Sequence, residues 1–61
     1  MNTAAAIDLC TPIVAARILQ LDETGLLDAV NGGRLPAYDL GGAIRFRVAD
    51  VEELARDLVA A

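Results

Sequence analysis

The sequence contains no histidine, serine, lysine or tryptophan, and its only cysteine is Cys10. Without Ser and His the chain cannot build a Ser-His-Asp or Cys-His pair, and without Lys it cannot form a Schiff base. A structural zinc site draws on several Cys and His ligands. A single Cys excludes an intrachain disulfide and suits a reducing cytoplasm. These absences predict no catalytic residue for one chain acting alone, no cofactor and no metal site.

Long apolar runs are also missing, so no segment is expected to span a bilayer. The segment Met1–Ala6 lacks the basic region and long apolar stretch of a signal peptide. We therefore expect a cytoplasmic protein with no membrane partner. The 61 residues allow one domain, which we place at residues 9–61, preceded by a flexible arm at residues 1–8. A domain this small is marginally stable, and self-association would help it.

The residues that are present indicate two helices joined by a short turn. Thr11 is a good N-cap, and Pro12 suits the first helical position. Asp22 is a good cap for a second helix over Glu23–Asn31, which the pair at residues 32–33, Gly-Gly, should end. Apolar residues recur at helical spacing and give the first helix one apolar face, formed by Val14, Ala15, Ile18 and Leu19. In the second helix, Leu26 and Val30 are four residues apart and are expected to face the core.

The pattern then changes to that of a β-hairpin. Two short runs, residues 35–40 and 43–47, flank Gly41-Gly42, which is typical of a tight turn between strands. In the second run Ile44 and Phe46 alternate with Arg45 and Arg47, which predicts an apolar face and an arginine face.

The clearest helix covers residues 48–60. Its predicted apolar positions follow the helical repeat: Val51, Leu54, Ala55, Leu58 and Val59. The predicted fold is mainly α with a small β-hairpin wing.

This order of elements resembles the excisionase and MerR-like winged helix-turn-helix family. The resemblance extends from Leu9 to Leu58 without a gap. Its most specific part is Gly-Arg-Leu-Pro-Ala-Tyr at residues 33–38, followed by Gly41-Gly42 and by Ile-Arg-Phe-Arg at residues 44–47. It implies double-stranded DNA as the partner, bound by a transcriptional regulator or by a recombination directionality factor of a phage or mobile element.

The resemblance also implies site residues. In such proteins the second helix enters the major groove and the wing touches the DNA backbone or minor groove. The groove-facing residues would be Thr24, Leu27, Asp28 and Asn31. The residues that meet phosphates would be Arg34, Arg45 and Arg47.

The charges of this chain depart from that pattern. Nine Asp and Glu residues against five Arg give a net charge of -4, and three acids face one Arg between Asp22 and Arg34. DNA affinity comes largely from counterion release, roughly one decade or less per neutralised phosphate. Three arginines then supply roughly 3 kcal/mol, against about 11 to 15 kcal/mol for specific binders. A single copy is thus expected to bind weakly, so DNA binding would need cooperation between several copies or help from a partner.

Two functions of the second helix are therefore compatible with the sequence. Besides DNA binding, the same fold could serve as an acidic module that binds or inhibits a basic or nucleic-acid-binding protein through Asp22, Glu23, Leu27 and Asp28.

Several side chains also have plain structural alternatives. Arg34 could cap helix carbonyls, and Tyr38 could pack at the core edge. Arg45 and Arg47 could form a solvated strand face or pair with Asp39 across the hairpin. Cys10 is expected to be a small core residue.

Overall fold

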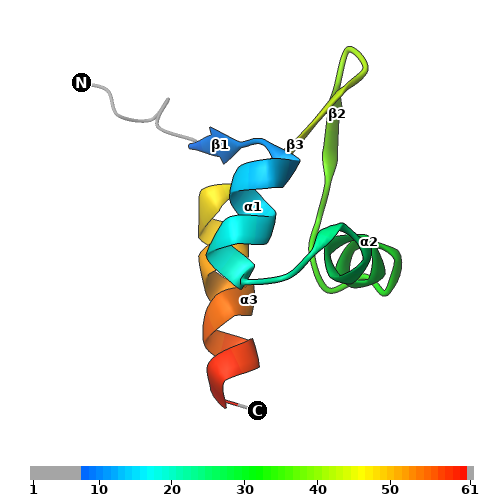
Figure 1. Cartoon of the computed structure of the whole chain (residues 1–61). Coiled ribbons are helices and arrows are strands. Elements are labelled where there is room, and N and C mark those ends of the chain that lie inside the picture. Colours follow the sequence, from blue (N-terminus) through cyan, green and yellow to red (C-terminus); the bar gives the residue numbers. More distant parts are fainter. Residues whose placement is uncertain (1–7, 61) are drawn as a thin grey trace, which may run out of the picture.

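The computed structural model describes residues 8–60, so all of the predicted arm except Asp8 lies outside the described residues. Three helices and a small antiparallel sheet build the fold (Figure 1). The predicted helices are confirmed. In chain order the elements are β1 (Leu9–Cys10), α1 (Pro12–Leu19), α2 (Glu23–Asn31), β2 (Tyr38–Leu40), β3 (Ala43–Arg47) and α3 (Val48–Ala60).

Both predicted helix caps form. The Thr11 Oγ1 atom accepts a hydrogen bond of 3.3 Å from the backbone N–H of Val14, and Asp22 Oδ1 accepts one of 2.8 Å from Gly25 N–H. Each cap satisfies an N–H that the first helical turn leaves without a partner. Gln20 ends α1 in the left-handed conformation with φ of 58°. The chain thereby reverses within a few residues and leads into α2.

The hairpin closes through Gly41 and Gly42, whose φ values of 67° and 95° suit a two-residue turn of the type that matches strand twist. The first strand is shorter than predicted, because it begins at Tyr38 and not at Leu35. The backbone N–H groups of Arg34 and Leu35 both donate to the Ala29 carbonyl at the end of α2. This arrangement places Leu35 in the core, where it is 1% exposed.

The sheet has a third strand that the sequence analysis did not predict. β1 pairs antiparallel with β3, with Leu9 opposite Arg47 and Cys10 opposite Phe46, so β3 is central in the order β1-β3-β2. The Val48 N–H also donates to the Asp8 carbonyl at 2.9 Å. The hairpin is therefore anchored to the segment that leads into α1.

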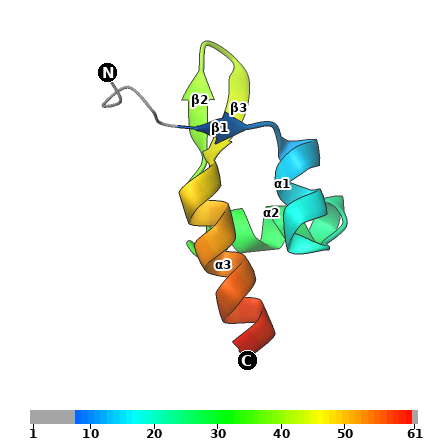
Figure 2. The same ribbon diagram turned by 90° about the vertical axis from the view of Figure 1, so that its left-hand side faces the viewer.

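The core lies where α1, α2 and α3 meet the inner face of the sheet. α1 and α3 lie side by side, and α2 packs against α1 (Figures 1 and 2). The buried residues are Cys10, Ala15, Leu19, Leu26, Ala29, Leu35, Phe46, Val51 and Leu54.

Three residues of the predicted apolar faces lie outside the core. Val14 and Ile18 of α1 are 40% and 37% exposed, and Val59 is 87% exposed. The last turns of α3 extend beyond α1, so Val59 has little to pack against (Figure 1). Val30 is half-buried against the core, while its neighbour Ala29 is fully buried. Among residues 8–60, none of the three helices combines the length and hydrophobicity that a bilayer-spanning helix requires.

Candidate nucleic-acid interface

The outer face of α2 carries the residues expected to face the DNA groove. Thr24, Leu27 and Asn31 are all exposed, and their spacing of three and four residues keeps them on one side of the helix. Leu27 is 53% exposed, whereas its neighbour Leu26 is buried. The structure therefore presents these three side chains together to solvent.

The electrostatics of α2 are those of an acidic helix. Glu23 and Asp28 are exposed beside the three predicted groove residues, and no Arg or Lys occurs from residue 22 to residue 33. The N–H of Gly25 already donates a hydrogen bond to the Asp22 carboxylate. Free N–H groups at a helix N-terminus attract phosphate, but here carboxylates take that position. Phosphate attraction must therefore come from residues outside α2.

The outer face of the sheet supplies two arginines. Arg45 is opposite Tyr38 and Arg47 is opposite Leu9, while Phe46 points to the other side and is 2% exposed. The predicted alternation of β3 is confirmed at these positions. Ile44 lies on the same side as Phe46 but is 39% exposed, because it sits near the hairpin tip.

Each of these arginines has a contact within the fold. The Arg45 Nη1 donates to the Ile44 carbonyl at 2.8 Å. Arg47 Nε lies 3.4 Å from Asp50 Oδ2, within ion-pair distance. The alternative that Arg45 or Arg47 pairs with Asp39 does not hold. Asp39 is opposite Ile44 and so projects from the other face, and its Oδ1 accepts a 2.7 Å hydrogen bond from Gly42 N–H in the turn.

Arg34 lies in the link between α2 and the hairpin, and its side chain is exposed. Its backbone N–H donates to Ala29 at 2.9 Å, so the backbone closes α2 here. Within residues 8–60, the Arg34 guanidinium makes no hydrogen bond or ion pair. The alternative that this side chain caps helix carbonyls therefore does not hold. Of the three arginines, Arg34 has the guanidinium most available to a ligand.

Sequence reasoning missed an apolar strip beside the sheet arginines. The strip consists of Leu9, Tyr38 and Leu40, which are 43%, 36% and 52% exposed. Together with Arg47, these three residues line a depression in the surface. Tyr38 thus lies on the outer sheet face, opposite Arg45. The strip depends on the pairing of β1 with β3, and two residues are too short to show a strand period.

Cys10 is part of the core. Cys10 is a free thiol at 8% exposure, as predicted for a small core residue, and burial raises its pKa. A thiol held in its neutral form is a poor nucleophile and a poor metal ligand. In the part of the chain that the structure describes, no three His, Cys, Asp or Glu side chains are grouped to hold a metal ion.

Comparison with known proteins places this geometry in a family. Residues 9–58 match the family described as "Helix-turn-helix domain", which comprises excisionase-like DNA-binding domains. Such domains are generally not enzymes. No match was found among curated proteins or among solved structures. Because the match extends over both helices, the wing and most of α3, this chain belongs to the excisionase-like helix-turn-helix family of DNA-binding domains.

Proposed function

We propose that this chain is a small DNA-binding protein of the excisionase or MerR type, acting as a transcriptional regulator or as a recombination directionality factor. α2 enters the major groove, and the β2–β3 hairpin is the wing that meets the DNA backbone. One observation carries the proposal: the family match covers residues 9–58, which include both helices of the helix-turn-helix and the β2–β3 hairpin. Figure 1 shows α2 and β2 on the same side of α1 and α3.

The exposed face of α2 offers a small set of base contacts. The Thr24 hydroxyl and the Asn31 amide can hydrogen bond to base edges in the major groove, and Asn suits adenine. Leu27 can contact the methyl group of thymine, which is the main apolar feature of that groove. These contacts favour a site rich in A·T pairs opposite α2.

The phosphate contacts are few. Arg34, Arg45 and Arg47 are the candidates, and the last two already have contacts within the fold. Three phosphate contacts give a salt slope of about −2.7, since each contributes about −0.9. Binding by one copy is accordingly weak, and a functional complex forms when several copies bind neighbouring sites cooperatively.

A titration of labelled duplexes at several salt concentrations tests this proposal. A random-sequence pool first selects a site, and tandem copies of that site are then compared with one copy by fluorescence anisotropy. We expect a salt slope no steeper than about −3 and tighter binding per copy on tandem sites. Arg34→Glu should weaken binding by about tenfold or more, because it replaces an attraction with a repulsion.

The matched control is Arg56→Glu, which makes the same charge change at an exposed position on α3. Equal losses in the two variants would show that only net charge matters and would contradict the proposed face. Absence of any binding at micromolar protein and low salt would reject DNA binding by this chain.

A second function is favoured by the acidity of α2. Glu23, Leu27 and Asp28 are exposed beside the Asp22 cap, so the outer face of α2 combines an exposed apolar side chain with carboxylates. Such a surface is complementary to a basic partner with an apolar contact. In this function the fold binds or inhibits a basic or nucleic-acid-binding protein, and α2 is the contact.

A further inference from the structure

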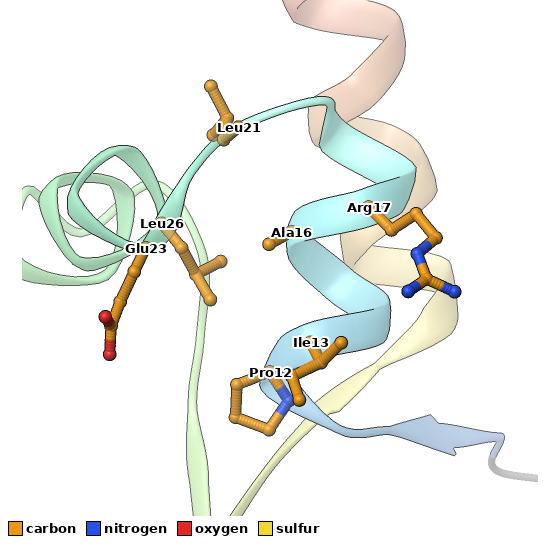
Figure 3. A pocket seen from close by; sticks show the side chains of 7 residues that line it. All are labelled: Pro12, Ile13, Ala16, Arg17, Leu21, Glu23 and Leu26. Carbon is orange, nitrogen blue, oxygen red and sulfur yellow. The ribbon is translucent and has the colours of Figure 1, made fainter.

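A groove lies between α1 and α2 (Figure 3). Ile13, Ala16 and Arg17 contribute from α1, Leu21 from the turn, and Glu23 and Leu26 from α2. The groove has a volume of about 550 Å³, and most of the residues that line it are apolar. Space of this size between two helices is enough to receive a large apolar side chain.

Ile13, one of the residues that line the groove, has a large apolar side chain. It is 71% exposed, and it lies in the first turn of α1 with no place in the core. Removing this apolar surface from water would favour association. The groove and the residue that could fill it are therefore both present on the same chain.

The two charges of the groove come from opposite helices. Arg17 belongs to α1 and Glu23 to α2, and within residues 8–60 neither forms an ion pair. A two-fold rotation brings the same patch of both copies together, so each contact occurs twice with the roles exchanged. One cation and one anion at the two sides of a groove are complementary to themselves under that rotation.

We propose that this groove is the interface of a two-fold symmetric dimer of this chain. Ile13 of each copy enters the groove of the other, and each Arg17 pairs with the partner's Glu23. One apolar side chain from each copy and two ion pairs make a small interface, for which we expect association on the order of micromolar. Leu27, Asn31 and the sheet arginines are not among the residues that line the groove.

Sedimentation velocity over a range of concentrations, without DNA, tests the apolar half of the interface. The unaltered chain should shift from monomer to dimer at micromolar concentrations, and Ile13→Asp should stay monomeric. The control is Val59→Asp, which alters another highly exposed apolar residue, on α3, and should still dimerise. Circular dichroism confirms that each variant is folded. A chain that stays monomeric at millimolar concentration, or equal effects of both substitutions, would overturn the proposal.

Charge exchange tests the geometry. Arg17→Glu and Glu23→Arg should each be monomeric, because each places two like charges together twice. An equal mixture of the two variants should recover the dimer, since both ion pairs then form with reversed sign. The double variant R17E/E23R should dimerise as well. A mixture that remains monomeric would refute the pairing. Because no DNA is present, the outcome is independent of whether the proposed DNA binding is correct.

Discussion

Arg47 is the residue whose two roles are hardest to separate. Its side chain is 47% exposed and so is accessible to a phosphate, yet its Nε lies 3.4 Å from Asp50 Oδ2. That carboxylate oxygen is shielded from solvent and accepts no hydrogen bond from the described residues. Arg47 is thus the nearby positive charge for a shielded oxygen. A change at Arg47 alters the stability of the fold together with any contact to DNA.

We predict that Arg47→Ala lowers the free energy of unfolding by about 1 kcal/mol, because it leaves the Asp50 oxygen without a compensating charge. Asp50→Asn should lower it less, since an amide carries no charge to compensate. Urea unfolding of both single variants and the double variant gives the coupling energy. If the two effects simply add, the ion pair contributes nothing to stability.

At the scale of elements, the sequence predicted the features that depend on contacts between residues close together in the chain. The caps at Thr11 and Asp22 and the positions of the three helices depend on neighbours a few residues away, and the sequence predicted them correctly. The alternation of Arg45 and Arg47 on β3 was predicted for the same reason. The predicted outer residues of α2 are likewise exposed, since the buried Leu26 fixes which side of that helix faces the core.

Features that depend on distant contacts were missed. β1 exists because its two residues pair with Phe46 and Arg47, which are more than 35 positions away in the chain. Leu35 looked like a strand residue, but closure of α2 draws it into the core. Val59 fits the helical period, yet nothing covers that turn of α3. The apolar strip of Leu9, Tyr38 and Leu40 follows from the same long-range pairing.

The hairpin turn gives a prediction at this scale. Gly42 has φ of 95°, so Gly42→Ala should lower the free energy of unfolding by about 1 kcal/mol through backbone strain. Nothing lies within 4 Å of the added Cβ, so a steric clash does not contribute. Gly41→Asn creates the Asn-Gly pair that this turn type prefers and should leave stability unchanged or slightly raised. Urea midpoints measure both, and equal losses would contradict the turn assignment.

At the scale of the whole molecule, charge is distributed unevenly. Glu23 and Asp28 are exposed on α2, the helix that the proposed function directs at DNA, while Arg34, Arg45 and Arg47 lie outside α2, in the link and on the sheet. A net charge of -4 opposes approach to a polyanion over a Debye length of about 8 Å at physiological salt. Weak binding thus follows from the position of the acids as well as from their number. The same fold is compatible with a DNA partner and with a basic protein partner.

Reversing one charge on α2 separates these two functions. If α2 enters the major groove, Asp28→Arg removes a repulsion and adds an attraction near phosphates, so DNA affinity should rise by about tenfold or more and the salt slope should steepen by about 1. If α2 binds a basic protein, the same variant should lose that partner. The control is Asp57→Arg, which makes an identical charge change at an exposed position on α3. Anisotropy titrations of the three proteins on one duplex measure the difference. A gain for Asp28→Arg that does not exceed the gain for Asp57→Arg would show that α2 does not face DNA, and the acidic face would then be assigned to a protein contact.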